Sequence, residues 1–574
     1  MKYIGKLKNY NRPWLKFYGR TPANLDYPEC SMFEMLEKSK DEYGNYIAIE
    51  YMNKKITYSK LYSQILSCVS ALAEIGIKKG DKITICLPNI PQAVILFYAV
   101  NAIGAVANMI HPLSAKGEVE EFVNISHSKV LFIFDSFYQN AEGLECPELE
   151  YIILAGAADC LNPFLKKFFN FKERKNLPEK EKIRSGNFKS WESFLSGFKH
   201  TFSLEAGAVK YNDCAAILYS GGTTGTQKGI MLSNLNFNAM AEQTIALGAP
   251  DFVAGDSMLA VLPMFHGFGL GVCIHTAIAK AARIILVPRF NAGSFAKLII
   301  KKRPSFIAGV PTLYSALLNK NLLLKADFTG LKGIFSGADT LPVSLKENFD
   351  KLLAKNGSKV MLREGYGLTE CVTACALTPD GCWRKGSIGV PYPDTLFKIV
   401  VCDTVKEAEP NAEGEICIFG PTVMLCYMDN DQETAQVLKL HEDGRIWLHT
   451  GDMGYMDEDG FVYFKLRIKR MFKCAGYSVY PNQIEQVINS HPAVSMSCVI
   501  GIRDKYKMHK ICAIVVPEKS AGSMDEETLK ISIMELCRDK IAKWSLPSCI
   551  EIRDSIPLTK VGKIAYTELE KEYD

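Results

Sequence analysis

Residues 82–110 read KITICLPNIPQAVILFYAVNAIGAVANMI, and this stretch decides the fold class. The short β-rich runs at its two ends, 82–88 and 106–110, are typical of buried strands. The longer apolar run between them, 90–104, predicts a helix. A strand, a helix and a second strand in succession favour helices layered on a largely parallel sheet.

The same alternation continues on both sides of this stretch. Before it, 46–58 predicts a hairpin and 60–76 an amphipathic helix. After it, strands are expected at KVLFIFD, AAILYS, MLAVLP, RIILVP and SFIAGV, with apolar helical stretches between the later ones. The sequence therefore predicts a large N-terminal α/β domain built from layered β-sheets.

The pattern changes twice toward the C-terminus. After about Gly386 the chain is rich in strands and punctuated by glycine, which predicts a small β-subdomain. Beyond Arg467 a new set of strands and helices predicts a small α+β unit. We therefore expect an N-terminal domain over 1–466 (β-subdomain about 386–466), a hinge at 467–469 and a mobile C-terminal domain over 470–574.

The composition excludes several classes of protein. A chain of 574 residues corresponds to about four domain-sized units. Hydrophobic residues make up 48% and charged residues 23%, which is typical of a globular protein and not of a disordered one. The 67 Lys plus Arg exceed the 63 Asp plus Glu by only +4, so we expect no nucleic acid as principal partner.

The eighteen cysteines are scattered along the chain, and the first residues, MKYIGKLKNYNRP, contain no apolar run typical of a signal peptide. Reduced thiols in the cytoplasm are therefore expected. The densest group, Cys371, Cys375 and Cys382, lacks the paired C-x-x-C spacing of a structural zinc site, which favours small buried thiols. No run approaches the roughly 20 apolar residues of a membrane-spanning helix.

A basic insertion interrupts the α/β pattern at 160–200. Nine Lys or Arg lie between Lys166 and Lys189, against three Glu, and the segment also carries several aromatic residues, namely Phe164, Phe168, Phe169, Phe171 and Trp191. One interpretation is a peripheral contact of 164–190 with an anionic membrane surface, such as the inner face of the membrane. The other, which we favour, is a solvated surface loop.

A Gly/Thr-rich loop, YSGGTTGTQKG at 219–229, follows the strand AAIL and precedes a helix that begins near Asn234. Glycines let backbone N–H groups approach oxygen-rich ligands, and hydroxyl and ammonium groups add further donors. The spacing fits neither the P-loop nor G-x-G-x-x-G, and a plain turn is the alternative. The residues that we expect to bind phosphate are Ser220, Gly221, Gly222, Thr223, Thr224, Gly225 and Lys228.

Four further segments follow in order along the chain. They are YGLTE at 366–370, LHTGD at 448–452, RIKRMFKCAG at 467–476 and PLTKVGK at 557–563. Together with the loop at 219–229, the set resembles the adenylate-forming superfamily, which includes acyl-CoA synthetases, nonribosomal-peptide adenylation domains and beetle luciferases. The resemblance extends over roughly residues 30–570.

The resemblance implies a nucleotide site. Thr369 and Glu370 are similar to the family's nucleotide and magnesium pair, and a carboxylate is a suitable ligand for Mg²⁺. Tyr366, with Gly367, resembles the adenine contact, since its flat ring can stack on a base. Asp452 resembles the residue that accepts hydrogen bonds from both ribose hydroxyls, and Arg467 the second ribose contact.

The resemblance also implies an acyl site and moving parts. SGAD at 336–339 is similar to the loop that lines both sites, with Gly337 and Ala338 toward the nucleotide and Ser336 and Gly309 toward the acyl group. His266 resembles the histidine that borders the carboxylate channel. The expected mobile parts are the catalytic Lys563, the hinge residue Lys469 and, at the CoA channel, Gly476.

The resulting functional hypothesis is an ATP-dependent acyl-CoA synthetase that uses ATP, Mg²⁺ and CoA. Amino-acid-activating relatives carry an Asp soon after the Phe that corresponds to Phe265, whereas here no acid follows before Asp327. That absence and the basic insertion favour a medium- or long-chain fatty acid as the small-molecule carboxylate. The alternatives are an aryl or other carboxylate, transfer to the phosphopantetheine of an acyl carrier protein, and a catalytically inactive nucleotide-binding scaffold.

Overall fold

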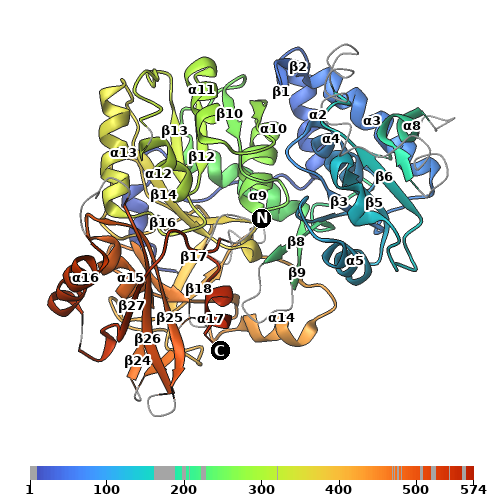
Figure 1. Ribbon diagram of the computed structural model, residues 1–574. Coiled ribbons are helices and arrows are strands. Elements are labelled where there is room, and N and C mark those ends of the chain that lie inside the picture. Colours follow the sequence, from blue (N-terminus) through green and yellow to red (C-terminus); the bar gives the residue numbers. More distant parts are fainter. Residues whose placement is uncertain are drawn as a thin grey trace.

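The computed structural model is drawn in Figure 1. It describes residues 10–160, 188–196, 202–205, 207–220, 228–319, 321–467, 470, 472–474, 477–479, 481–504, 508–518, 525–541, 543–558 and 564–573. Within them no helix is both long and apolar enough to cross a bilayer.

The first large sheet has nine strands, joined in parallel from β14 through to β1 and antiparallel at both ends. Its order is β16 (Val390–Pro391), β15 (Ala374–Leu377), β14 (Leu362–Gly367), β13 (Gly333–Ser336), β12 (Phe306–Gly309), β10 (Ser257–Ala260), β11 (Arg283–Leu286), β1 (Ile47–Tyr51) and β2 (Lys54–Thr57). The predicted hairpin at 46–58 thus forms one edge of this sheet.

The second large sheet has eight strands, and its parallel part contains both strands predicted within 82–110. Its order is β19 (Cys426–Tyr427), β9 (Lys228–Ser233), β8 (Cys214–Ser220), β4 (Val106–Met109), β3 (Lys82–Cys86), β5 (Ser128–Phe134), β6 (Tyr151–Ala155) and β7 (Phe188–Ser190). Strand β9 was not predicted; it pairs antiparallel with β8 and carries the chain from the Gly/Thr-rich loop to α9.

Helices cover the sheets. The helix α4 (Pro91–Ala102) is buried on every side, as expected for a helix with few polar residues, and it packs against α2 (Met32–Tyr43) and α3 (Tyr58–Glu74). The remaining helices of this part are α5 (Lys116–Ile125), α8 (Trp191–Ser196), α9 (Asn234–Gln243), α10 (Ala277–Ala279), α11 (Ala292–Lys302), α12 (Pro311–Asn319) and α13 (Val343–Lys355). The predicted mixed α/β class with layered, largely parallel sheets is confirmed.

A five-stranded antiparallel sheet follows, made of β17 (Leu396–Val400), β18 (Gly414–Phe419), β20 (Leu438–Leu440), β21 (Ile446–Met456) and β22 (Val462–Arg467), with α14 (Asp431–Val437). The last part contains β23 (Phe472–Cys474), β24 (Tyr477–Val479), α15 (Pro481–Asn489), β25 (Val494–Asp504), β26 (Met508–Pro517), α16 (Glu526–Lys540), β27 (Cys549–Ile552) and α17 (Tyr566–Lys571). Figure 1 shows these last elements together at the lower left, below the nine-stranded sheet. The proposed boundaries at 466 and 470 stay predictions.

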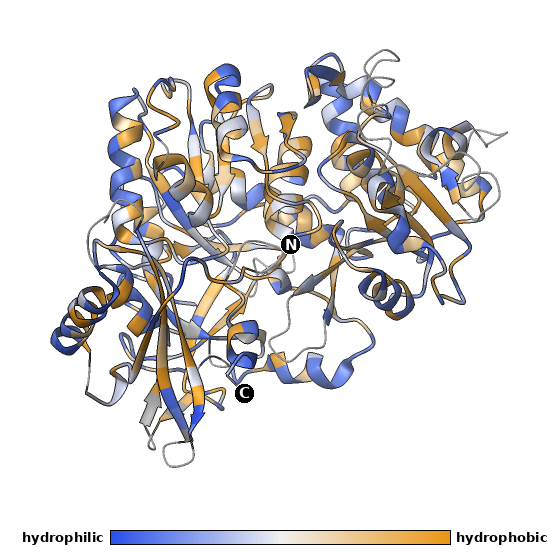
Figure 2. Ribbon diagram, in the orientation of Figure 1, coloured by the Kyte–Doolittle hydropathy of each residue, from blue (hydrophilic) through white to orange (hydrophobic). Residues whose placement is uncertain are grey.

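The buried apolar side chains of the N-terminal and C-terminal elements form separate clusters. One large apolar cluster runs from Trp14 to Val462, and two smaller clusters lie between Cys474 and Leu569. In Figure 2 the outer helices α13 and α16 are striped blue and orange, as expected for helices that bury one face. The C-terminal elements therefore have a core of their own, which a separate unit requires.

Most of the basic insertion, 161–187, lies outside the described residues, so neither interpretation of 164–190 is tested. Trp191 is described, and it is not at the surface. Its ring is buried at the start of α8 and lies 6.1 Å from that of Phe132 and 5.9 Å from that of Phe194. This tryptophan belongs to the core and takes no part in a surface contact.

Glu364, on β14, is the basis of a first prediction. Its side chain is buried and accepts a hydrogen bond from the Leu341 N–H at 2.9 Å, and burial raises the pKa of the carboxyl to about 8. Because the folded protein holds this proton more tightly than the unfolded chain does, stability falls as pH rises between about 4.5 and 8. Each pKa unit corresponds to about 1.4 kcal/mol.

We expect Glu364→Gln to keep an acceptor for Leu341 while removing this titration. The variant should melt at a higher temperature than the parent at about pH 8.5 and at nearly the same temperature at about pH 4.5, near the unfolded pKa. Thermal unfolding across this pH range measures the difference. An equal gap at both pH values would contradict the raised pKa.

Candidate active site

The motif residues of the nine-stranded sheet gather at one edge because of strand direction. Strands β10, β12, β13 and β14 are parallel neighbours, so their carboxyl ends lie side by side. Gly309 and Ser336 are the last residues of β12 and β13, and the segments that leave β10 and β14 contain His266 and Glu370. Ligands of open α/β sheets bind outside the carboxyl ends of the strands.

Two of these loops pack backbone against backbone. A Cβ added at Gly267 would lie 1.6 Å from the carbonyl oxygen of Val372, so only glycine permits this approach. Val372 itself has φ of +64°, which is costly for a β-branched residue. The contact brings the segment of His266 next to the end of YGLTE.

Tyr366, Asp452 and Arg467 form one polar group. The Tyr366 hydroxyl donates to Asp452 Oδ2 at 2.6 Å, and Arg467 Nε lies 3.2 Å from Asp452 Oδ1. Burial, followed by the nearby carboxylate, raises the pKa of Tyr366 well above its usual value, and the same carboxylate raises the pKa of Arg467. Asp452 is only 2% exposed, so these partners keep its charge from being buried alone.

Strand register explains how this group forms. Asp452 and Arg467 are opposite each other in the antiparallel pair β21–β22. Two hydrogen bonds stabilise the backbone at Asp452. Glu415 accepts from the Gly451 N–H at 2.9 Å, and Thr450 Oγ1 accepts from the Asp452 N–H at 3.1 Å. Gly451 has φ of +71°, which suits glycine.

A second polar group surrounds Tyr427. Its hydroxyl donates to Glu370 Oε1 at 2.8 Å, and the Lys228 ammonium lies 5.0 Å from the centre of its ring. Lys228 also pairs with Glu433 at 2.7 Å. Since β19 pairs with β9, Tyr427 connects the end of the Gly/Thr-rich loop to Glu370, which lies half-buried next to the buried Thr369.

The loop 336–339 leaves the end of β13, next to the end of β12. Ser336 is 1% exposed, and its Oγ is a buried polar atom without a hydrogen-bond partner among the described residues. The N–H of Gly337 bonds to the carbonyl of Gly309 at 3.2 Å, and Ala338 has φ of +70°. A buried polar atom without a partner is costly and marks a place where a ligand can supply one.

His266 lies half-buried in the turn after β10, where its Nδ1 is 3.4 Å from the Phe268 N–H. The ring of the preceding Phe265 lies 4.4 Å from that of His111. Gly367, also a predicted site residue, is the last residue of β14.

Several predicted site residues lie outside the described residues, namely Gly221, Gly222, Thr223, Thr224, Gly225, Lys469, Gly476 and Lys563. Ser220 is the last residue of β8, and its backbone alone is described. Their roles stay predictions.

Sequence reasoning missed Tyr427. It is 57 residues from Glu370 in the chain, and the surrounding letters, MLCYMDN, contain no pattern of periodicity or loop chemistry that singles it out. Only the pairing of β19 with β9 brings it into the site.

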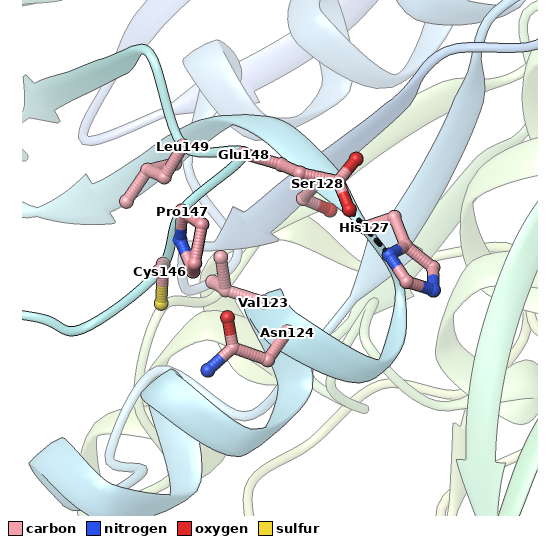
Figure 3. Close-up of a pocket in the computed structure, with 8 residues that line it drawn as sticks. All are labelled: Val123, Asn124, His127, Ser128, Cys146, Pro147, Glu148 and Leu149. Carbon is pink, nitrogen blue, oxygen red and sulfur yellow. Dashed lines mark hydrogen bonds and ion pairs between the residues drawn. The ribbon is translucent and has the colours of Figure 1, made fainter.

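A surface cavity of about 250 Å³ lies elsewhere, between α5, β5 and the segment before β6. Figure 3 shows its lining and the contact of His127 Nδ1 with Glu148 Oε1, which measures 2.6 Å. None of the predicted site residues lines this cavity, so it is separate from the group at the carboxyl edge of the nine-stranded sheet.

Comparisons with known proteins point to one family. The family model described as AMP-binding enzyme matches residues 36–428, and the model of the AMP-binding enzyme C-terminal domain matches 483–563. The long-chain-fatty-acid–CoA ligase of Bacillus subtilis (strain 168) is 32% identical over 572 residues, covering 98% of each chain. The ligase of the same name from Escherichia coli O157:H7 is 31% identical, covering 97% of this chain and 98% of that one.

Among solved structures, the anthranilate CoA ligase AuaEII in complex with anthranoyl-AMP superposes with a TM-score of 0.82. The match covers 96% of this chain and 98% of that one at 22% identity. At this identity the likeness concerns the fold alone.

The close approach at Gly267 generates a prediction. We expect Gly267→Ala to lower the thermal midpoint by several degrees, because a Cβ that close to a backbone oxygen forces two loops apart. Gly330→Ala is the matched control, since a Cβ there meets nothing within 4 Å. Thermal unfolding of both variants provides the measurement, and equal midpoints would show that the two loops do not pack as described.

Proposed function

Because the chain belongs to the AMP-binding enzyme family, we propose that it is an ATP-dependent acyl-CoA synthetase that acts on a long-chain fatty acid. The observation that carries this proposal is the pair of polar groups, one of Tyr366 with Asp452 and Arg467 and one of Tyr427 with Glu370. The relatives over the whole chain support the choice of acid and of CoA.

The first group suits a nucleoside. The ring of Tyr366 offers a flat face for adenine, and ribose hydroxyls can donate to the carboxylate of Asp452 in place of the Tyr366 hydroxyl. Arg467 balances the charge of that carboxylate and is half-exposed, so its guanidinium can also reach the sugar. The adjacent Gly337 and Ala338 leave room for the base.

The second group suits the phosphates. Lys228 supplies a cation at the end of the loop that contains Ser220 to Gly225, whose N–H groups we propose to bind phosphate oxygens. Glu370 and Thr369 offer the carboxylate and hydroxyl oxygens that Mg²⁺ prefers, and these residues would hold the ion. When bound, Mg²⁺ neutralises phosphate charge.

The first half-reaction joins the acid to AMP. A carboxylate oxygen forms a bond to the α-phosphorus, and the bond from that phosphorus to the bridging oxygen breaks, so pyrophosphate leaves. Both reactants are negative, and we propose that the Lys563 ammonium relieves their repulsion. His266, Gly309 and Ser336 would border the acyl group, with the buried Ser336 Oγ able to donate to it.

The second half-reaction forms the thioester. The CoA thiol, as its thiolate, bonds to the acyl carbon, and the bond from that carbon to the AMP oxygen breaks. We propose that the domain over 470–574 rotates relative to 1–466 about Lys469 between the two steps, exchanging Lys563 for the face of Gly476. Within this proposed domain, its last helix contacts its first residues. The ring of Tyr566, the first residue of α17, lies 4.6 Å from the guanidinium of Arg470.

A long-chain acid partitions into lipid. A membrane contact of 164–190, the alternative to the solvated loop that we favour, would place its basic residues against an anionic leaflet at the inner face of a membrane. Two alternatives predict other products. An aryl acid as substrate would give pyrophosphate release with aryl acids, and transfer to a carrier protein would give a thioester on its phosphopantetheine.

The test is pyrophosphate release with a panel of carboxylic acids, each measured with and without CoA. We expect release with long-chain fatty acids above short and aromatic ones, and thioester formation when CoA is present. Lys563→Ala should lower adenylate formation by orders of magnitude while largely sparing thioester formation from supplied acyl-AMP. Release with aryl acids alone, or thioester on a carrier protein alone, would overturn the assignment.

The contact of Tyr427 with Glu370 generates a further prediction. Removing its hydroxyl by Tyr427→Phe should raise the Mg²⁺ concentration needed for half-maximal activity by about tenfold, because the partner that orients a ligating carboxylate is lost. Tyr463→Phe is the matched control, since it removes a tyrosine hydroxyl that donates to Asp457 at 3.3 Å away from the site. Identical Mg²⁺ profiles for the two variants would contradict the role of Tyr427.

A further inference from the structure

Three side chains of metal-ligating type meet in the five-stranded sheet, away from the residues assigned to the reaction. They are Cys417 on β18, His441 between β20 and β21, and His449 on β21. One ligand atom from each lies within 4.8 Å of the other two. The three side chains are 0%, 4% and 4% exposed.

Strand pairing brings these residues together, next to a register shift between Glu415 and Cys417 in the β18–β21 ladder. Cys417 and His449 are register partners in the antiparallel pair β18–β21, so their side chains leave the same face of the sheet. His441 is added by the tight return from β20 to β21, where its N–H bonds to the carbonyl of Arg445 at 3.0 Å. The cluster is thus built on strands and a short connection, which position ligands more rigidly than a long loop.

We propose that Cys417, His441 and His449 form a binding site for a transition-metal ion of the Zn²⁺ class. One thiolate and two imidazoles are ligands that Zn²⁺ accepts, whereas Mg²⁺ and Ca²⁺ require oxygen ligands. The described residues provide three donors here, so the fourth tetrahedral position is left to water.

Glu415 is the second, independent observation in favour of this site. Its Oε2 lies 2.7 Å from His449 Nδ1, so His449 can donate there and present Nε2 to an ion. A carboxylate that accepts from the outer nitrogen of a ligating histidine fixes the orientation and tautomer of that ring. The other oxygen of Glu415 accepts from the Gly451 N–H at 2.9 Å, which holds the carboxylate in place.

The two imidazoles hydrogen-bond to each other, His441 Nε2 to His449 Nε2 at 3.0 Å. Metal binding replaces this hydrogen bond with two metal–nitrogen bonds and requires the thiol proton of Cys417 to leave. The two nitrogens need to move apart only slightly, because nitrogens on one tetrahedral ion lie about 3.3 Å apart for bonds of about 2.0 Å, and the rings must tilt so that both lone pairs point at the ion.

The positive charge of Lys398 should weaken the binding of a cation at this cluster. Its ammonium lies 3.5 Å from His441 Nδ1, and that nitrogen carries a hydrogen once Nε2 binds metal. Lys398 must then turn to its other partners, Asp443 at 3.2 Å and the ring of Trp447 at 4.3 Å. Removing this charge should therefore strengthen metal binding.

The experiment uses the full-length protein, stripped with a chelator, kept reduced without competing thiols and titrated with Co²⁺. We expect one Co²⁺ per chain to give a thiolate-to-cobalt charge-transfer band with tetrahedral d–d bands, all removed by added Zn²⁺. Cys417→Ser should abolish the charge-transfer band, and His441→Asn should abolish the tetrahedral spectrum. Glu415→Gln should weaken binding by about 10- to 100-fold, and Lys398→Met should tighten it.

Cys549→Ser is the control for the other thiols of the chain, because Cys549 is the exposed cysteine of the described residues and lies in the C-terminal part. It should leave the spectrum unchanged. A charge-transfer band that survives in Cys417→Ser, a tetrahedral spectrum that survives in His441→Asn, or the absence of any thiolate band in the parent would overturn the site. Because the readout is spectroscopic, it stands or fails separately from the proposed acyl-CoA synthesis.

Discussion

The hydrogen bond from Tyr366 to Asp452 ties two sheets together and positions the site between them. Tyr366 lies near the end of a strand of the nine-stranded sheet, and Asp452 belongs to the five-stranded one. Neither sheet alone supplies both groups. The bond at 2.6 Å therefore aligns a flat ring from one sheet with a carboxylate from the other.

The burial of Asp452 carries a desolvation cost and restricts the positions that its partners can take. A carboxylate that is 2% exposed has lost its hydration and needs partners, which Tyr366 and Arg467 provide while the Asp452 N–H contact to Thr450 fixes its backbone. A low local dielectric strengthens each of these interactions. Under the proposed function, ribose hydroxyls would take the place of the Tyr366 hydroxyl, so the Asp452 carboxylate would keep hydrogen-bond partners.

The eight-stranded sheet enters the site through Tyr427. Its hydroxyl reaches Glu370 while its ring lies beneath the ammonium of Lys228, so one aromatic side chain sets the distance between a carboxylate and a cation. Polar side chains from three sheets thus contribute to the candidate site. The cluster of Cys417, His441 and His449 lies on the far side of the turn before Asp452, joined to it by Glu415.

The sequence alone determined the α/β class, the change of pattern near Gly386 and Arg467, and the motif loops, because strand and helix periodicity and glycine-rich loops depend on residues close together in the chain. It also indicated Tyr366, Glu370 and Asp452 as site residues. Tertiary structure decided what depends on strand order: the contact of Tyr427 with Glu370, the burial of Trp191 in the core, and the meeting of Cys417 with two histidines. These contacts join residues from different elements, and no local pattern records which strands become neighbours.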